Sequence, residues 1–432
     1  MNNKRTIKLN VPFITRLEGE GALELSAQGD TIEKLHLKIF EPPRLFEKFL
    51  EGKSYKDVPD LNARICGICP MAYQLTSIQA IERLFGIKLP KQLVQLRRLM
   101  NLGEWIQSHA LHIHFLAAPD FLGFDSAIHM AKQHPEILQR GMRLQETGNA
   151  LMALLGGRSV HPVGLQVGGF GRLPERKRWD TVRTLVDNAL PDAKSLIAWT
   201  TTLELPDYSH EFIWVSLKHS KQYPINGGKI AASNGLNLTY NSYDKHFHEH
   251  QVPHSTAFYS LLNGQDYLVG PLARLNNNYR ILPSAIKKYV ESLGIRFPNQ
   301  NMFTSIQARA IEIYFSLYEA RKILDKGCPV EAPYVTVTPK AGTSCFCTEA
   351  PRGMIYHRYQ LDEEGRVIRC TIIPPTSQNQ ARIEQDLKYS VKKFGLNHSD
   401  QTLKFFCEKV IRNYDPCISC STHFLDFKIL RS

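Results

Sequence analysis

The stretches RICGICP (residues 64–70) and DPCISCSTH (residues 415–423) decide how this chain is interpreted. Each contains one Cys-x-x-Cys pair. A tight turn brings the two sulfurs of such a pair within a few ångströms, so each pair can place two thiolates on one metal ion. We therefore predict a single metal centre, built from opposite ends of the sequence, whose ligands are Cys66, Cys69, Cys417 and Cys420.

Three kinds of site are compatible with two Cys-x-x-Cys pairs. A structural zinc site usually closes a short loop, with about 12–20 residues between its pairs, whereas most of the chain separates these two. A thioredoxin-like redox pair belongs in a βαβ context, which neither pair shows. The spacing favours a catalytic or electron-transfer metal centre but leaves the other two open.

The other cysteines are interpreted as structural thiols. The total of nine is odd, and the N-terminus lacks the apolar segment of a signal peptide, so a disulfide framework is not expected. Cys328, Cys370 and Cys407 lie in apolar or mixed contexts and should be buried. Cys345 and Cys347 would share a face if their run is a strand, but no third ligand is near them in sequence.

Length and composition are typical of a soluble globular protein. With 432 residues, of which 43% are hydrophobic and 22% charged, the chain can bury a large core. Its longest mainly apolar stretches fall short of the ~18–20 residues that a membrane-spanning helix needs. The net charge of +12 is interleaved with acidic residues, which favours acidic partner subunits or an anionic cofactor over nucleic acid. A cytoplasmic location is expected.

Periodicity predicts an α+β fold with a long-helix core and β elements towards both ends. Strands are expected at Ile7–Val11, Ala22–Leu25, Ile32–Phe40, Val335–Val337, Gly353–Leu361 and Val367–Ile373. Helices are expected at Arg44–Gly52, Met71–Leu84, Lys91–Phe115, Pro135–Leu155, Pro174–Leu203, Pro283–Leu293, Met302–Lys326, Asn379–Phe394 and Asp400–Arg412. Because no linker divides the chain, residues 1–423 are predicted to form one catalytic unit, followed by an extension, 424–432.

The motifs together resemble those of the large, nickel-bearing (alpha) subunit of [NiFe]-hydrogenases. That family carries Arg-x-Cys-Gly-x-Cys near its N-terminus and Asp-Pro-Cys-x-x-Cys-x-x-His at its C-terminal end, and both are complete here. Further matching segments occur in the family's order: RLEG (16–19), GGR with HP (156–162), EAPRG (349–353) and PPTSQN (374–379). The resemblance covers essentially the whole chain.

The resemblance implies a Ni–Fe centre whose iron also carries CO and CN⁻. By matching position, Cys66 and Cys417 would be terminal ligands of nickel, whereas Cys69 and Cys420 would bridge nickel and iron. Thiolates are soft, strongly donating ligands that suit nickel better than they suit hard cations.

The resemblance also implies residues around the metals. Pro375 would pack against the CN⁻ ligands of the iron, and Thr376 would donate a hydrogen bond to one of them. Glu47, a backbone carbonyl near Ile372, and His423 match the ligands of a buried Mg²⁺. Carboxylate and carbonyl oxygens fit this hard cation, whereas imidazole is a less usual ligand for it.

Proton transfer is assigned in the same way. Glu18 matches the carboxylate that takes the proton from the terminal thiolate of Cys417. Arg352 would lie over the open metal position, next to Asp415. The implied activity is heterolytic oxidation of H₂ and reversible reduction of protons.

Three positions depart from the family's pattern. Tyr73 stands where many members have a His that hydrogen-bonds a bridging sulfur, and its hydroxyl could substitute for the imidazole. Ser108 stands in place of an active-site Asp, and Glu20 in place of a His. These changes affect the surroundings of the metals, not the ligand set. The chain length and the Cys-Pro-x-Ala-Tyr-Gln variant most resemble the cytoplasmic branch that couples H₂ to NAD(P).

Electrons are expected to leave through partner subunits. The sequence offers neither a further set of cluster-binding cysteines nor a Gly-x-Gly-x-x-Gly fingerprint. The resemblance implies an iron–sulfur small subunit, flavin- and NAD(P)-binding diaphorase subunits, nickel-insertion factors and an endopeptidase that removes residues 424–432. Two alternatives remain: a quinone-oxidoreductase relative, whose subfamily has lost the nickel cysteines, and a non-catalytic scaffold of the same fold.

Overall fold

The computed structural model describes residues 6–330 and 332–422. His423 and the extension 424–432 therefore lie outside the described residues. The helices are α1 (Phe46–Leu50), α2 (Val58–Asn62), α3 (Pro70–Phe85), α4 (Lys91–Leu111), α5 (Ala118–Leu122), α6 (Ala127–Gln133), α7 (Pro135–Gly156), α8 (Arg176–Thr200), α9 (Tyr243–His246), α10 (Pro271–Asn278), α11 (Ser284–Ser292), α12 (Ser305–Leu324), α13 (Pro375–Phe394), α14 (Asp400–Asn413) and α15 (Ile418–Ser421).

The strands vary in length from two to nine residues and are dispersed along the chain. They are β1 (Thr6–Val11), β2 (Gly21–Gln28), β3 (Thr31–Ile39), β4 (Leu165–Gln166), β5 (Gly169–Phe170), β6 (Ile213–Lys218), β7 (Lys229–Ala232), β8 (Asn237–Leu238), β9 (Phe247–Val252), β10 (Ser255–Leu262), β11 (Tyr267–Leu268), β12 (Gly342–Ala350), β13 (Gly353–Leu361) and β14 (Val367–Ile373).

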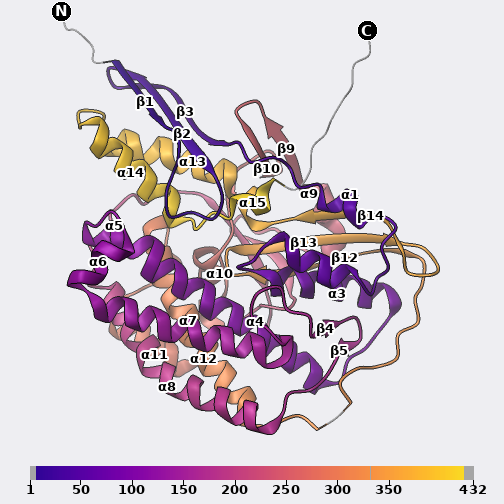
Figure 1. The fold of residues 1–432 in the computed structure, drawn as a ribbon. Coiled ribbons are helices and arrows are strands. Elements are labelled where there is room, and N and C mark those ends of the chain that lie inside the picture. The colour runs from indigo at the N-terminus through magenta and orange to yellow at the C-terminus, as the bar shows by residue number, and fades with distance from the viewer. Residues whose placement is uncertain (1–5, 331, 423–432) are drawn as a thin grey trace, which may run out of the picture.

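Helices α4, α7, α8 and α12 pack side by side and form the long-helix core (Figure 1). The crossing of α4 and α7 is close because each contributes a glycine. A Cβ on Gly148 would lie 2.6 Å from the carbonyl oxygen of Gly103, and a Cβ on Gly103 would lie 2.8 Å from that of Gly148. Absence of both side chains lets the two backbones approach, and buried leucines fill the space on either side.

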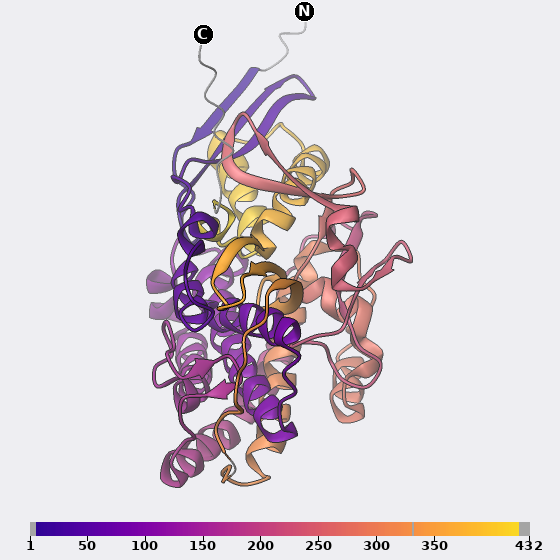
Figure 2. The same ribbon diagram turned by 90° about the vertical axis from the view of Figure 1, so that its right-hand side faces the viewer.

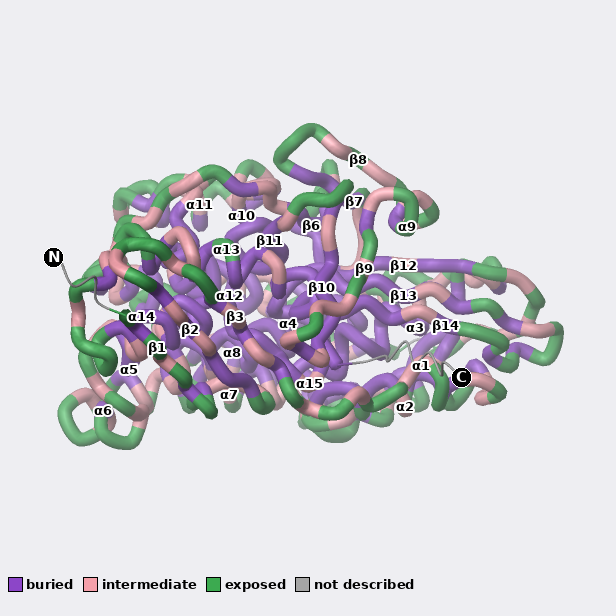
Figure 3. Tube along the Cα trace, turned by 90° about the horizontal axis from the view of Figure 1, so that it is seen from above, coloured by how far each residue is buried: buried purple, intermediate pink, exposed green. Residues whose placement is uncertain are grey.

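Two antiparallel sheets flank this core. The β1–β2–β3 meander stands at the top of the molecule and packs against α13 and α14 (Figures 1 and 2). The β12–β13–β14 sheet lies against α3 and shares the main core with the helices. Seen from above, buried segments run through the middle of the molecule and exposed segments form its rim (Figure 3).

The predicted α+β fold with a long-helix core is confirmed, with local corrections to one strand and two helices. The strand expected at Val335–Val337 is wrong: Tyr334 forms only an isolated bridge to Gly169, and the next strand is β12. A proline on either side of this run restricts it to a short extended segment. Helix α13 begins at Pro375 rather than Asn379, because proline suits the first position of a helix.

The helix expected at Lys91–Phe115 also differs in detail. α4 ends at Leu111, and a π-helical segment, His112–Ala117, continues it into α5. Among residues 6–330 and 332–422, no helix is both long and apolar enough to cross a bilayer.

Candidate metal centre

The four cysteine sulfurs of the two motifs converge in the interior. Cys417 Sγ lies 3.5 Å from Cys66 Sγ and 2.7 Å from Cys420 Sγ. The sulfurs of Cys66, Cys69 and Cys420 all lie within 4.8 Å of one another. With metal–sulfur bonds of about 2.3 Å, two thiolates on one ion lie at most ~4.6 Å apart. The cluster therefore has the dimensions of a thiolate metal site.

The local backbone structure positions the first cysteine pair, Cys66 and Cys69. Cys66 follows a short 3₁₀ turn and Cys69 immediately precedes α3, so the backbone N–H groups of Ile68 and Cys69 point at Cys66 Sγ. The buried carboxylate of Glu104 accepts hydrogen bonds from the first N–H groups of α3, those of Met71 (2.6 Å) and Ala72 (3.2 Å). This contact fixes the start of α3 and with it the first pair.

The cysteine thiols differ in the direction in which their surroundings shift their pKa. Hydrogen bonds from Cys417 and Cys420 hold the pKa of Cys66 well below its usual range, whereas burial raises that of Cys417 well above it. The positive charge of Arg352 also favours the Cys66 thiolate. Thiols must lose their protons to bind a metal ion, so the binding of a cation by these sulfurs releases protons.

Arg352 and Asp415 form a buried ion pair beside the sulfurs. Arg352 Nε donates to the Asp415 carbonyl oxygen at 2.6 Å, and Nη2 donates to Asp415 Oδ1 at 2.9 Å. Asp415 adopts a left-handed backbone conformation, with φ of 56°, two positions before Cys417. The pair joins the β12–β13 turn to the C-terminal motif.

Glu18 lies against the second pair. Cys417 Sγ donates to Glu18 Oε2 at 3.1 Å, and the same carboxylate accepts the Ser419 backbone N–H at 3.1 Å and the Ser419 hydroxyl at 2.6 Å. The backbone takes part as well, because the Ile418 N–H donates to the Glu18 carbonyl at 3.0 Å. Hydrogen bonds from Ser419 and the backbone contact with Ile418 thus hold the Glu18 carboxylate beside the Cys417 thiol.

Several buried polar atoms around the cysteines lack a hydrogen-bond partner among the described residues. They are Arg352 Nη1, Asp415 Oδ2 and the Tyr73 hydroxyl, and Ser108 Oγ on α4 is likewise buried without a partner among these residues. Burial raises the pKa of Tyr73 well above its usual range, and the neighbouring Cys420 and Cys69 raise it further, so the hydroxyl keeps its proton. A buried polar group without a partner is costly. Four soft ligands with unsatisfied donors beside them therefore fit a metal that carries polar ligands of its own.

The other expected site residues lie close by. Thr376 Oγ1 accepts the Cys417 backbone N–H at 3.0 Å, which leaves the hydroxyl proton of Thr376 to donate elsewhere, and Pro375 starts the same helix. Glu47 on α1 accepts the Ile372 backbone N–H at 2.7 Å. In an antiparallel strand the N–H and C=O of one residue point to the same side, so the Ile372 carbonyl also faces α1. His423 is outside the described residues.

Sequence reasoning missed two residues that hold the site together. Ser419 fixes Glu18, and the Arg44 guanidinium donates to the backbone carbonyls of Ile65 (2.7 Å) and Ser419, one from each cysteine motif. Ser419 stands inside the second motif, so its position was a usable signal. Arg44 has no local signal, because its partners become neighbours only on folding.

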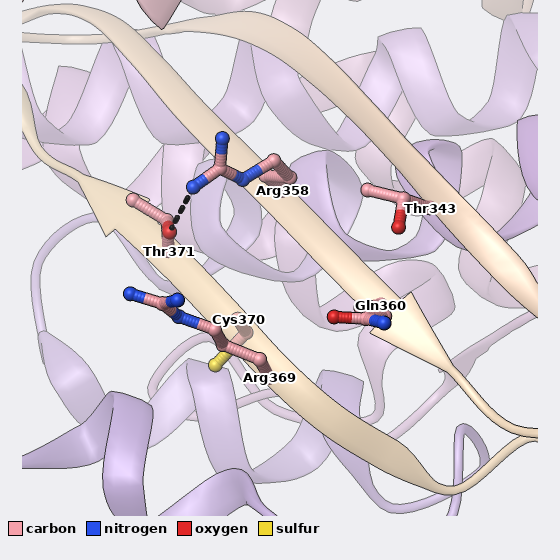
Figure 4. Close-up of a pocket in the computed structure, with 6 residues that line it drawn as sticks. All are labelled: Thr343, Arg358, Gln360, Arg369, Cys370 and Thr371. Carbon is pink, nitrogen blue, oxygen red and sulfur yellow. Dashed lines mark hydrogen bonds between the residues drawn. The ribbon is translucent and has the colours of Figure 1, made fainter.

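A surface cavity of about 200 Å³ lies away from the sulfurs, on the outer face of the β12–β13–β14 sheet (Figure 4). Arg358 and Gln360 from β13 and Arg369 and Thr371 from β14 line it, and Arg358 donates to Thr371 Oγ1 at 3.2 Å. An adjoining cavity of about 290 Å³ is lined by Glu47 as well as by Arg369 and Thr371. Glu47, near the N-terminal end of α1, therefore borders a cavity on this face of the molecule.

Comparisons with known proteins agree on one family. The model of the nickel-dependent hydrogenases matches residues 44–142 and 259–423. The chain is 32% identical to the alpha subunit of sulfhydrogenase 2 from Pyrococcus furiosus, over 95% of this chain and 98% of that one. It is 25% identical to the beta subunit of the NAD-reducing hydrogenase HoxS from Cupriavidus necator, over 97% and 95%.

Solved structures give the same result for the fold. A crystal structure of an NAD⁺-reducing [NiFe]-hydrogenase in the H₂-reduced state superposes with a TM-score of 0.87 at 25% identity, covering 98% of this chain and 100% of that one. A [NiFeSe]-hydrogenase from Dm. baculatum superposes with a TM-score of 0.76 at 19% identity, covering 97% and 100%.

Proposed function

The chain belongs to the nickel-dependent hydrogenase family, and we propose that it is the catalytic subunit of an enzyme that oxidises H₂ and reversibly reduces protons. The observation that carries the proposal is the contact of Glu18 with Cys417 at the edge of a four-cysteine cluster. It combines soft metal ligands with a carboxylate placed to move a proton, and heterolytic cleavage of H₂ needs both. A quinone-type relative or a scaffold needs neither.

The thiolates of Cys66, Cys69, Cys417 and Cys420 would hold the nickel and the iron. A bound Ni–Fe pair, with CO and CN⁻ on its iron, would supply the redox chemistry for splitting H₂. The free hydroxyl proton of Thr376 supports a hydrogen bond from this residue to such a ligand, because its oxygen already accepts the Cys417 N–H.

Glu18 moves the proton in this proposal. Its Oε2 lies at hydrogen-bond distance from the Cys417 sulfur, within the range over which a carboxylate accepts a proton directly. Ser419 holds both carboxylate oxygens, so Glu18 cannot swing away between turnovers. Arg352, kept in place by Asp415, provides positive charge beside the thiolates.

A Mg²⁺ bound by Glu47, the Ile372 carbonyl and His423 is also part of the proposal. Ile372 lies against the Glu47 carboxylate, and the carbonyl oxygen of Thr422, the last described residue, accepts the Arg44 backbone N–H at 3.0 Å. Arg44 is three positions before Glu47. These contacts support His423 as the third ligand. The proposal also includes the removal of residues 424–432, which rests on the family resemblance and leaves one catalytic unit, 1–423. Nickel-insertion factors and an endopeptidase would carry out this maturation.

For the electron acceptor we propose NAD(P), reached through an iron–sulfur small subunit and flavin-containing diaphorase subunits in the cytoplasm. Two relatives support this assignment: the HoxS beta subunit and the solved NAD⁺-reducing enzyme, both of which align along nearly the whole chain.

The test is purification of the chain together with the subunits that accompany it. We expect nickel and iron in the preparation, H₂-dependent reduction of a viologen dye, and H₂-dependent reduction of NAD⁺ or NADP⁺. A preparation that contains neither metal and shows no H/D exchange would establish the quinone-type relative or the scaffold instead. Activity with the dye but with neither nucleotide would reject only the acceptor.

A further inference from the structure

A second group of metal-ligating side chains lies on the β1–β3 side of the molecule. His36 on β3, His254 in the turn between β9 and β10, and Glu384 on α13 bring one ligand atom each within 4.8 Å of one another. Glu384 is buried and both histidines are half-buried. The three residues come from segments far apart in the sequence, so folding alone creates the group.

The carboxylate of Glu384 is fixed in place by its neighbours. Glu384 Oε1 accepts the backbone N–H of Leu37 at 3.0 Å and the hydroxyl of Tyr259 at 3.0 Å, and it lies 2.8 Å from His254 Nε2. Metal-binding carboxylates are held in the same way, by hydrogen bonds from residues that do not touch the ion.

One ring nitrogen of His36 lacks a hydrogen-bond partner among the described residues. Its Nδ1 is buried and has no hydrogen-bond partner in the part of the chain that the structure describes, although it faces Glu384 Oε1 at 3.9 Å. The His36 and His254 rings stack with centroids 4.0 Å apart. Two imidazoles lie next to one carboxylate, and the Nδ1 atom of His36 is unsatisfied. These side chains therefore offer ligand atoms for a metal ion.

The local charge also suits a cation. Besides Glu384, the charged side chains acting on His36 are Glu24 and Lys388, which have opposite signs. Glu24 is engaged with Lys38 at 3.3 Å. The buried carboxylate of Glu384 thus contributes one negative charge between two imidazoles, and a divalent ion bound by two neutral imidazoles and one carboxylate needs such a charge.

We propose that His36, His254 and Glu384 bind a divalent transition-metal ion of the zinc class. Two imidazoles and one carboxylate are a recurrent zinc ligand set that leaves a fourth position open to water. The ion would fasten β3 and the β9–β10 hairpin to α13. It is separate from the nickel site, because Glu384 lies eight positions after Thr376 on the same helix, about 12 Å along its axis.

The competing interpretation is a hydrogen-bonded cluster without metal, in which His254 and Tyr259 satisfy Glu384 and the two rings simply stack. The two interpretations differ in stoichiometry. Only the metal site takes up an additional ion that depends on both His254 and Glu384.

The experiment uses the nickel-loaded enzyme with its accompanying subunits, dialysed against micromolar Zn²⁺. We expect one zinc per chain more than in a His254→Gln or a Glu384→Gln variant, with nickel and iron content unchanged in all three. His248 and His250, on the adjacent exposed strand β9, supply the matched control: the double variant His248→Gln/His250→Gln should retain the zinc.

Co²⁺ in place of Zn²⁺ gives a second readout. The wild-type enzyme should show the visible bands of a nitrogen- and oxygen-ligated tetrahedral ion, absent from the His254→Gln variant. Zinc should also raise the unfolding temperature of the wild type but not of that variant. The proposal is overturned if the wild type takes up no additional zinc, or if zinc is lost from the β9 double variant and kept by His254→Gln, which would show an adventitious ion only. Because nickel content and dye reduction are measured in parallel, failure here is distinct from failure of the hydrogenase assignment.

Discussion

Cys417 Sγ lies 3.1 Å from Glu18 Oε2, although 399 positions separate the two residues in the chain. Their backbones also meet, as an isolated parallel bridge. The loop after β1 and the C-terminal motif thus form one local unit. In it the Cys417 thiol and the Ser419 hydroxyl both donate hydrogen bonds to the Glu18 carboxylate.

The first prediction concerns this proton path. Glu18→Gln keeps the shape of the side chain but removes the proposed proton acceptor, so H₂-driven dye reduction and H/D exchange should each fall by at least about 100-fold. Nickel and iron content should stay normal. Glu20→Gln is the control, because Glu20 lies two positions later and is exposed, and its backbone N–H donates to Glu41 Oε1 at 2.7 Å. Equal losses in both variants would show that the charge of the loop matters, not the Glu18 carboxylate.

The second prediction concerns the geometry of the same loop. Gly19 has a φ of 86°, and a Cβ there would lie 2.5 Å from Glu41 Oε1 and 2.8 Å from Ile418 Cβ. Gly19→Ala should therefore push Glu18 away from Cys417 and slow H/D exchange as Glu18→Gln does, with metal still bound. Gly52→Ala is the control, because φ is also positive there and nothing stands within 4 Å of the added Cβ. Normal exchange in Gly19→Ala would mean that the contact of Glu18 with Cys417 is not needed.

The third prediction concerns the ligands. Cys417→Ala or Cys66→Ser should abolish nickel binding and activity, because a missing or hard ligand cannot complete the thiolate set. Cys328→Ser changes a partly exposed cysteine elsewhere in the chain and should leave metal content unchanged. Nickel at wild-type stoichiometry in Cys417→Ala would refute the four-cysteine centre.

The fourth prediction concerns the buried guanidinium. Arg352→Lys keeps the positive charge but cannot make both hydrogen bonds that Arg352 donates to Asp415. Activity should therefore fall by about 10–100-fold while nickel stays bound. Arg97→Lys removes a comparable fork, to Glu82, at the far end of α3. It should affect stability but not the specific activity of the folded enzyme.

Sequence patterns predicted what depends on local periodicity. The bounds of amphipathic helices such as α7 and α14 were predicted to within one residue, because successive turns repeat the same signal. Two-residue strands such as β4 and β11 carry too few residues to form a pattern. The change of α4 into a π-helix at His112 leaves apolar spacing almost intact, so periodicity cannot detect it.

The candidate site divides in the same way. Motif spacing identified the cysteines, Glu18, Arg352 and Asp415, since each belongs to a short run of characteristic residues. Contacts such as Arg44 with the two cysteine motifs depend on chain segments that only folding brings together. The Tyr73 hydroxyl shows the converse: the sequence suggested a hydrogen-bonding substitute for His, and the structure places it without a partner among the described residues.

The last prediction concerns pH and lies outside the metal centre. His114 is buried on the π-helical segment, where Arg140 Nε donates to its Nε2 at 3.2 Å and its Nδ1 lies 2.9 Å from the Ala110 carbonyl. This arrangement requires the neutral ring with its proton on Nδ1. Burial, and then the charge of Arg140, lower the pKa of His114 from 6.5 to about 3.

Because the pKa is lower in the folded state, protonation between pH 6.5 and about 3 takes place only after unfolding, and the wild type loses stability as pH falls through this window. Above pH 6.5 both states are neutral and the effect vanishes. Relative to His114→Gln, the wild type should lose about 2 kcal/mol of unfolding free energy between pH 7.5 and pH 5, at about 1.4 kcal/mol per pH unit below 6.5. Urea unfolding of the two proteins at both pH values, followed by tryptophan fluorescence, measures this difference. His129→Gln, at an exposed position, should track the wild type. Equal loss of stability in wild type and His114→Gln would mean that the folded protein accommodates a charged ring at this position.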